Sequence, residues 1–247
     1  MPPPRRARPV GVVLVDKPAG PSSFAMVAGL RRRTGARTGH TGTLDPFATG
    51  LLVQLSGAAT TLAPCFAGLD KRYVTDVDLT ATTSTGDPEG ERLEEHEPPS
   101  RVELEERLAL LRGEVELPIP AASAVKIGGE RAYKLARRGV AVEMPRRRSH
   151  VDALDVIAYS GDTVRLELHV GAGTYVRSIA AALGGHCLTL RRTAVGPFAV
   201  EEVGAGGERW LTVAEALGRL PADALARVAP AVRERVLALA AEDGART

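Results

Sequence analysis

Cysteine is scarce in this 247-residue sequence, and no apolar run is long enough to cross a bilayer. The only two cysteines, Cys65 and Cys187, lie far apart, which argues against a disulfide framework and against a CxxC-type metal site. The first ten residues, MPPPRRARPV, contain no apolar core of the kind that a secretory leader needs. We therefore expect a soluble, cytoplasmic protein.

Several common catalytic motifs are also missing. The sequence has no GxxxxGK[ST] for a P-loop, no GxGxxG between a strand and a helix, and neither GxSxG nor HExxH. Its five histidines do not show the spacing of metal ligands. We therefore predict no bound metal and no dinucleotide cofactor.

Charge is balanced overall but segregated along the chain. The net charge is +2, and the acidic residues are concentrated between Asp87 and Glu116. Segregation of this kind allows a nearly neutral protein to present a basic face to phosphates, although any single cluster also fits a solvated helix face. Four arginine clusters together favour a nucleic-acid partner: Arg31–Arg33 with Arg37, Arg137–Arg138, Arg146–Arg148 and Arg191–Arg192.

Hydrophobic patterns and capping signals predict an α+β protein. Ser22 or Ser23 is expected to cap a helix over 24–33 that stops at Gly35, and Ser100 with Glu103 forms a capping box for a helix to Arg112. Spacing of the strands is too irregular for a doubly wound parallel sheet, so a mixed, mainly antiparallel central sheet is expected. Strands are predicted at 11–18, 51–55, 71–79, 124–127, 150–159, 163–170 and 187–195; helices near 58–66, 130–138, 175–183 and 212–241; and loops at 80–99 and 117–122.

One stretch, GHTGTLDPFATGLL at 39–52, places a single carboxylate, Asp45, in a loop rich in glycine and threonine. The glycines allow the backbone to approach a ligand closely, and Pro46 restricts the turn that carries the carboxylate. A turn aspartate that only hydrogen-bonds its own backbone is the simpler alternative. The whole stretch favours a catalytic carboxylate.

This stretch resembles the signature of the tRNA pseudouridine synthase B family. Five further segments resemble motifs of that family in the same order: DKPAGPSS at 16–23, KRYVTDVDLTATTSTGDPEG at 71–90, SAVKIGGERAYKLARRG at 123–139, GAGTYVRSIAAALG at 171–184 and LRRTAVGPF at 190–198. The resemblance implies a pseudouridine synthase catalytic domain over 10–200, after a flexible tail at 1–9. Residues 201–247 are expected to form a short, mainly helical segment, too short for the small C-terminal RNA-binding domain that is common in the family.

The resemblance also implies a reaction, the isomerisation of uridine to pseudouridine at position 55 in the T-loop of tRNA. The N1–C1′ bond breaks, the base turns, and C5 bonds to C1′, so neither redox state nor bond count changes and no cofactor is needed. An anionic oxygen near the sugar would stabilise or trap oxocarbenium-like charge. Whether Asp45 attacks C1′, attacks the base or removes the C2′ proton stays open at this point.

Further site residues follow from the same resemblance. Arg177 is expected to pair with Asp45 and keep it ionised, and Tyr73 to stack on the target base. Tyr175 and Leu190 are expected to line the pocket. Arg177, Tyr73 and Leu190 each have a simpler alternative. Arg177 could be a surface arginine at a helix start, although the preceding GTY argues against this. The pattern alone fits a core tyrosine at 73 equally well, and a leucine in a strand such as Leu190 is a core residue by default.

Two residues beside the Asp45 loop complete the predicted site. His40 is expected to contact RNA where the flipped uridine has left its stack, and Lys17 to shape the floor of the site. A solvated turn histidine and a plain strand end are the alternatives. The sequence departs from the family pattern at Ala122, where an aromatic residue is common, and at Ser84, where the family has an acid.

The expected partner is the T stem-loop of tRNA, bound by a monomer. Two rival functions remain open: a synthase of the same fold that modifies another RNA, and a non-catalytic protein that folds tRNA.

Overall fold

The computed structural model describes residues 9–123, 125–132, 135, 138, 140 and 143–244 of the chain. Backbone contacts divide the chain into two compact units. Unit 1 comprises Met1–Lys71 and Arg191–Thr247, and unit 2 comprises Arg72–Leu190. Strand β12 (His186–Val195) supplies residues to both units, because the boundary falls within it.

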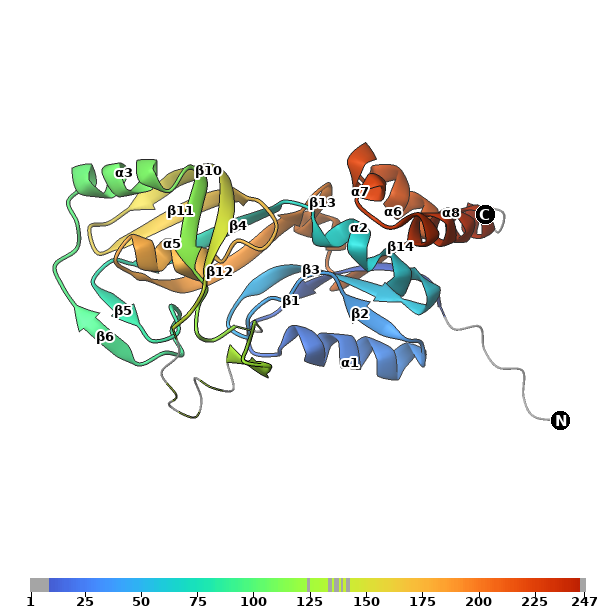
Figure 1. The fold of residues 1–247 in the computed structure, drawn as a ribbon, viewed down its shortest axis with the longest axis horizontal. Coiled ribbons are helices and arrows are strands. Elements are labelled where there is room, and N and C mark those ends of the chain that lie inside the picture. Colours follow the sequence, from blue (N-terminus) through green and yellow to red (C-terminus); the bar gives the residue numbers. More distant parts are fainter. Residues whose placement is uncertain are drawn as a thin grey trace. The chain divides into compact units, whose positions relative to one another are not determined.

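Unit 1 is built on a mixed sheet in which β1 and β3 are central, with the strand order β14–β1–β3–β12 (Figure 1). Strand β1 runs antiparallel to both of its neighbours, and β12 runs parallel to β3. Two short strands pair with this set, β2 with β3 and β13 with β12. The bounds are β1 (Gly11–Lys17), β2 (Thr38–His40), β3 (Thr49–Ser56), β13 (Phe198–Ala199) and β14 (Glu208–Leu211).

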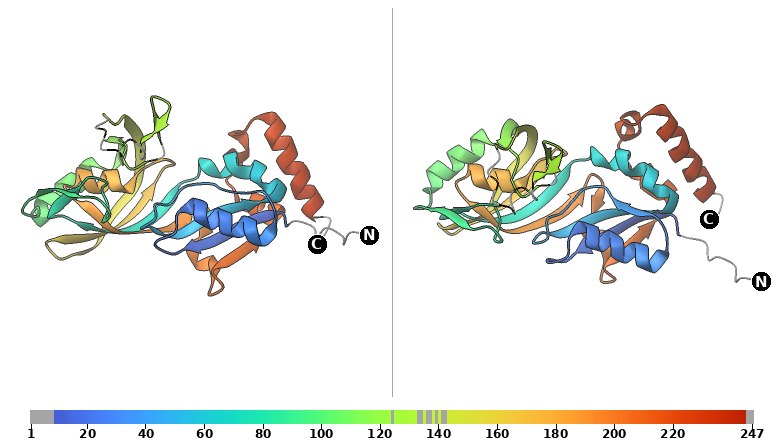
Figure 2. Two further views of the ribbon diagram at one scale, coloured as in Figure 1. Left: turned by 90° about the horizontal axis from the view of Figure 1, so that it is seen from below. Right: turned by 60° about the horizontal axis from the view of Figure 1, so that its bottom comes forward.

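Helices cover both faces of the unit 1 sheet (Figures 1 and 2). Alternate residues of β1 explain this, because successive side chains of a strand point to opposite faces. Val13 packs with Leu30 of α1, whereas Val12 belongs to a larger core that includes Val213 and Val236 from the C-terminal helices. The helical elements of unit 1 are α1 (Ser23–Thr34), η1 (Gly57–Leu62), α2 (Ala63–Ala67), η2 (Val200–Val203), α6 (Val213–Arg219), α7 (Ala222–Ala226) and α8 (Pro230–Gly244).

Unit 2 continues the strand order as β12–β4–β11–β10–β7, with antiparallel pairing of β10 to both β11 and β7. Two small antiparallel ladders, β5–β6 and β8–β9, lie outside this sheet. The bounds are β4 (Lys71–Asp78), β5 (Ala81–Thr83), β6 (Arg92–Glu95), α3 (Arg101–Leu110), β7 (Gly113–Pro118), β8 (Lys126–Ile127), β9 (Glu130–Arg131), β10 (Arg146–Tyr159), β11 (Thr163–Val170) and α5 (Val176–Ala182).

The predicted helix starts are confirmed. The Ser22 hydroxyl accepts from the Ala25 amide at 3.1 Å, and Gly35 ends α1 in a left-handed conformation. Ser100 and Glu103 form the predicted capping box of α3, and Thr212 with Glu215 forms a second one at α6.

Several element predictions are wrong. The expected loop at 80–99 contains β5 and β6, the expected loop from 117 overlaps the end of β7, and β13 and β14 were not expected. The single helix expected over 212–241 is three helices, α6 to α8. The helix expected at 130–138 falls partly on residues 133, 134, 136 and 137, which lie outside the described residues.

The C-terminal segment packs in the core of unit 1. Leu211, Val213, Ala216 and Val236 are all buried in the same cluster as Leu14 of β1. Within the described part of the chain, none of the helices is both long and apolar enough to cross a membrane.

Candidate active site

The Asp45 loop of unit 1 connects β2 to β3 and is closed at its base. His40 lies opposite Gln54 in the antiparallel register of the two strands, and the Thr41 amide donates to the carbonyl of Val53 at 3.1 Å. A loop whose ends are joined in this way loses less conformational entropy when it adopts one geometry, so Asp45 is presented from a constrained segment.

The helix α1 fixes the residue directly before Asp45. The buried hydroxyl of Ser23 accepts a hydrogen bond from the Leu44 amide and donates one to the Leu44 carbonyl, both at 2.8 Å. Leu44 itself is buried, whereas Asp45 is half-buried. On the other side of Asp45, the Gly20 amide donates to the Pro46 carbonyl at 2.8 Å. The backbone on both sides of Asp45 is therefore held, while Asp45 itself remains partly exposed.

A buried arginine joins the two ends of the Asp45 loop. Arg192 is 2% exposed, and its guanidinium donates to the carbonyls of Gly42 at 3.1 Å, Thr43 at 3.4 Å and Leu51 at 2.7 Å. The backbone of Arg192 also lies close to Gly50, whose φ is +100°. A Cβ atom at position 50 would fall 2.2 Å from the Arg192 carbonyl oxygen. The expectation that this arginine contacts phosphate is wrong, because its guanidinium is used inside the protein.

Lys17 lies against the same loop. The side chain is 0% exposed, and its ammonium donates to the carbonyls of Pro18 at 2.9 Å, Pro21 at 2.8 Å and Pro46 at 3.1 Å. Burial lowers the pKa of Lys17, the negative charge of Asp45 opposes that lowering, and Arg192 adds to it. These contacts place Lys17 against the Asp45 loop, and its role in shaping the floor of the site remains a prediction.

His40 is half-buried at the start of the loop. Its Nδ1 atom is buried and has no hydrogen-bond partner among the described residues. Burial lowers the pKa of His40, and the nearby positive charge of Arg192 lowers it further. The neutral imidazole is therefore favoured at pH 7.

Arg177 lies in the first turn of α5 in unit 2 and is 3% exposed. Its guanidinium donates to the carbonyls of Thr85 at 2.6 Å and Ala122 at 2.9 Å, and it forms an ion pair with the Asp87 carboxylate at 3.3 Å. Asp87 is 5% exposed, and its Oδ1 also accepts from the amide of Glu89 at 3.1 Å. A buried guanidinium with these partners is fixed in direction.

The remaining predicted residues of unit 2 lie on two strands and at one helix start. Tyr73 on β4 and Leu190 on β12 are each 7% exposed, so neither is a surface residue. Tyr175 directly precedes α5 and is half-buried. The hydroxyl of its neighbour Thr174 is buried and has no partner among the described residues, which leaves one polar group unused at this turn.

The structure thus brings Lys17, His40 and Asp45 together in unit 1 and assigns the other four predicted residues to unit 2. The predicted pairing of Asp45 with Arg177 and the stacking role of Tyr73 remain predictions. Sequence reasoning missed the clamping roles of Ser23 and Arg192, for which the sequence offers no signal. Asp87 lies in the segment 71–90 that resembles a family motif, and that resemblance was the available signal for the Arg177–Asp87 pair.

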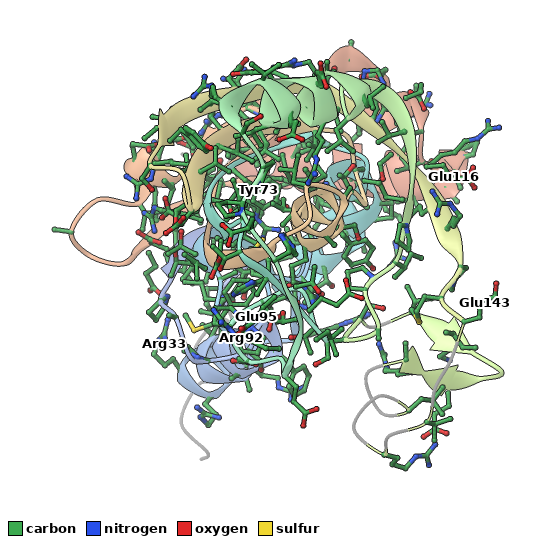
Figure 3. All side chains as sticks on the ribbon, turned by 90° about the vertical axis from the view of Figure 1, so that its left-hand side faces the viewer. Arg33, Tyr73, Arg92, Glu95, Glu116 and Glu143 are labelled. Carbon is green, nitrogen blue, oxygen red and sulfur yellow. The ribbon has the colours of Figure 1, made fainter. Side chains whose placement is uncertain are left out.

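One surface pocket among the described residues does not include any predicted site residue. It measures about 490 Å³, lies in unit 2 and is lined by Thr80, Arg92, Glu95, His96 and Glu97. Its one arginine, Arg92, lies beside Glu95 (Figure 3) and pairs with it at 2.6 Å. Arg92 also pairs with Asp78 at 3.5 Å. An acidic lining with a neutralised arginine offers little attraction to an RNA phosphate.

Comparison with known families decides the assignment. Residues 31–176, more than half of the chain, match the model described as TruB family pseudouridylate synthase, N-terminal domain. The chain belongs to the TruB family. The matched range contains Asp45, Tyr73 and Tyr175, and it ends one residue before Arg177.

Curated members of the TruB family resemble the chain over most of its length. The tRNA pseudouridine synthase B of Syntrophobacter fumaroxidans is 39% identical over 239 residues, which are 88% of this chain and 78% of that relative. The enzyme of the same name from Xanthomonas euvesicatoria pv. vesicatoria is 43% identical over 76% of this chain and 64% of its own length. For Mycobacterium sp. (strain KMS) the identity is 41% over 78% of this chain and 69% of the relative.

Solved structures support the TruB fold. The crystal structure of a Cbf5–Nop10–Gar1 complex contains a chain that matches with a TM-score of 0.60 at 28% identity, over 78% of this chain and 51% of that chain. The structure of an H/ACA RNP bound to a substrate RNA containing 2′-deoxyuridine matches with a TM-score of 0.57 at 25% identity, over 78% and 50%. The predicted fold, a pseudouridine synthase fold with a mixed sheet flanked by helices, is confirmed.

Proposed function

We propose that the protein converts uridine to pseudouridine in the T-loop of tRNA, at position 55. The observation that carries this proposal is the constrained loop that presents Asp45, in a chain of the TruB family whose curated relatives at about 40% identity are named tRNA pseudouridine synthase B. These relatives favour tRNA over the other RNAs that a synthase of the same fold could modify.

Asp45 supplies the anionic oxygen of the reaction. As the N1–C1′ bond breaks, positive charge develops at the sugar, and a carboxylate within reach stabilises or traps it. Such stabilisation is effective only when the anion is already fixed, because reorientation during the reaction would cost free energy. Ser23, Lys17 and Arg192 provide that fixation through the backbone on both sides of Asp45.

Arg177 and Tyr73 act on the carboxylate and the base, respectively. The guanidinium of Arg177 pairs with Asp45 in the complex and holds its carboxylate ionised, while Tyr73 stacks on the uracil and holds it while it turns. Tyr175 and Leu190 supply apolar contacts to the same base. These roles rest on the family resemblance together with the burial of Arg177, Tyr73 and Leu190, since buried side chains are held in fixed orientations.

His40 contacts the RNA where the target uridine has left its stack. Flipping costs a few kcal/mol of unstacking, and a partly buried, neutral imidazole offers a flat surface that replaces part of the lost contact. Isomerisation within one nucleotide requires no redox partner and no second substrate, so we propose a reaction without a cofactor, carried out by a monomer in the cytoplasm.

The proposal is tested by Asp45→Asn, assayed for pseudouridine in a T-arm stem-loop with a parallel measurement of RNA binding. We expect product formation to fall at least a thousandfold while the dissociation constant changes less than threefold, because the amide keeps the shape of the carboxylate and loses its charge. The matched control is Asp223→Asn, an exposed aspartate of unit 1 that pairs with Arg227. Unchanged product formation in Asp45→Asn would refute the mechanism, and modification of another RNA by the wild-type protein would refute the substrate.

A further inference from the structure

Phe24 is an exposed aromatic side chain in a chain with few aromatic residues. The sequence contains four phenylalanines, four tyrosines and one tryptophan. Among the described aromatic side chains, only Phe24, at 68% exposed, and Trp210, at 37%, are exposed. Phe66 and Phe198, by contrast, pack against each other in the core of unit 1 with ring centroids 5.5 Å apart. Phe24 therefore contributes little to the folded core.

The position of Phe24 ties it to the Asp45 loop. Phe24 directly follows Ser23, whose hydroxyl makes the two hydrogen bonds to Leu44, the residue before Asp45. The peptide bond and the Ser23 clamp therefore attach both residues to one rigid frame within unit 1. Phe24 is thus one residue away from the contact that holds Leu44, and Asp45 is the next residue after Leu44.

The same helix supplies positive charge on the side where Phe24 lies. Arg31 is seven residues after Phe24, so it lies two turns further along on the same face of α1, at a rise of about 10 Å. Arg31 and Arg32 are exposed and make no ion pair within the described residues, unlike Arg33, which pairs with Glu208. The first turn of α1 contains no acidic residue.

An aromatic ring beside unpaired arginines suits single-stranded nucleic acid, because bases stack on rings and phosphates attract the guanidinium groups. A protein partner would need a far larger apolar area than one side chain offers, since stable protein interfaces bury roughly 1,200 Å² or more. Charge complementarity therefore favours RNA as the occupant of this face.

We propose that Phe24 and Arg31 form an RNA-contact face on α1, in which Phe24 stacks on an unpaired base of the substrate near the target uridine and Arg31 contacts a phosphate. This inference rests on the proposed function in one respect, that the ligand of the Asp45 loop is an RNA loop. Phe24 touches a neighbouring base and takes no part in the isomerisation.

The first test measures the dissociation constant of a T-arm stem-loop for Phe24→Ala, Phe24→Leu and Phe24→Tyr. Stacking on an aromatic ring contributes about 1–3 kcal/mol per base, so Phe24→Ala is expected to weaken binding roughly tenfold or more. Phe24→Leu keeps the apolar surface without the ring and is expected to behave like the alanine variant, whereas Phe24→Tyr restores binding. The turnover number at saturating RNA is expected to stay within twofold of the wild-type value.

The matched control is Leu110→Ala, which removes a side chain that is 80% exposed on α3. It is expected to leave RNA affinity unchanged. If Phe24→Ala binds as tightly as the wild-type protein, or if Phe24→Leu binds as tightly as Phe24→Tyr, stacking by Phe24 is excluded.

A second test detects the stack directly. Trp210 is the only tryptophan of the chain, so the double variant Phe24→Trp with Trp210→Phe carries one fluorophore, at position 24. Stacking on a base is expected to quench its emission when the T-arm stem-loop is added, and the control Leu110→Trp with Trp210→Phe is expected to show no such change. Equal responses of the two variants would overturn the inference.

Failure of this inference and failure of the proposed function give different results. If Phe24→Ala and the fluorescence test show no effect while the wild-type protein forms pseudouridine in the T-arm, the contact face is wrong and the function stands. If the wild-type protein forms no pseudouridine but the T-arm quenches the tryptophan at position 24, the RNA-contact face stands and the reaction is wrong.

Discussion

The two buried lysines of unit 1, Lys17 and Lys71, donate hydrogen bonds to backbone carbonyls. Lys71 is 7% exposed and donates to the carbonyls of Leu69 and, at 3.3 Å, Ala67. Burial, with a smaller effect from Arg192, lowers its pKa to about 8, although Asp70 acts in the opposite direction. A lysine ammonium in this setting costs stability as long as it is protonated.

The pKa of Lys71 predicts a specific pH dependence of stability. Between about pH 8 and 10.5 the folded protein releases this proton while the unfolded chain keeps it, so the unfolded state binds more protons and stability rises with pH. We expect the free energy of unfolding of the wild-type protein, relative to Lys71→Met, to increase by on the order of 1 kcal/mol per pH unit in this range. Urea unfolding of both proteins at pH 7, 8, 9 and 10 measures it, and a difference that does not change with pH would contradict the prediction.

Single residues also show which parts of the site the sequence can predict. Asp45 was predicted as the catalytic carboxylate because glycine, threonine and proline around it form an unusual local pattern. Ser23 and Arg192 were not given their roles, because both act on backbone carbonyls or amides of residues distant in sequence, and backbone groups are the same at every position. The sequence therefore points to the carboxylate of Asp45, whereas only the fold shows which residues hold its loop.

At the scale of elements, two neighbouring serines at the start of α1 have different roles. Ser22 caps the helix, while Ser23 holds Leu44. We expect Ser22→Ala and Ser23→Ala to destabilise the protein by similar amounts, about 1–2 kcal/mol, the first through loss of the cap and the second through unpaired polar groups at Leu44. Only Ser23→Ala is expected to lower the turnover number, by roughly tenfold or more, because only that change loosens the Asp45 loop.

Thermal unfolding and single-turnover assays on the two variants separate these effects. Ser22→Ala serves as the control for a helix that is weakened without a change in the loop. A Ser23→Ala variant with wild-type turnover would show that α1 does not position Asp45.

Elements with strong local signals were predicted, and those without were missed. Caps at Ser22, Ser100 and Thr212 mark helix starts in the sequence because the signal lies within three or four residues. Strand β6 is exposed at all four positions, and β14 has only four residues, so neither shows the alternation that indicates a strand. Their pairing partners, β5 and β1, determine them instead. Helices α6 to α8 were merged because alanine and leucine continue through the segment, although Pro221 and Pro230 mark the two breaks.

At the scale of the whole molecule, the predicted catalytic residues are divided between two units. Asp45 belongs to unit 1, and Arg177, held by Asp87 and two carbonyls, belongs to unit 2. Arg177 has partners within unit 2, and the residues that flank Asp45 are held by partners within unit 1. The proposed reaction therefore requires residues of both units, because the two side chains must act as one pair on the same nucleotide.

A double-mutant cycle of reaction rates tests whether Asp45 and Arg177 act as a pair. Asp45→Glu moves the carboxylate by one methylene, and Arg177→Lys keeps the charge but loses the planar fork of the guanidinium. If the two groups act as a pair, either change alone already disrupts the pair, so the double variant is expected to lose at least tenfold less activity than the product of the two single losses. Single-turnover rates on the T-arm stem-loop give the coupling.

The control cycle combines Asp45→Glu with Arg219→Lys, a change at an arginine that pairs with Glu202 in unit 1. The activity loss of that double variant is expected to equal the product of the two single losses. Multiplicative losses for Asp45 and Arg177 as well would show that these residues contribute to the reaction independently, and the proposed pairing would then be abandoned.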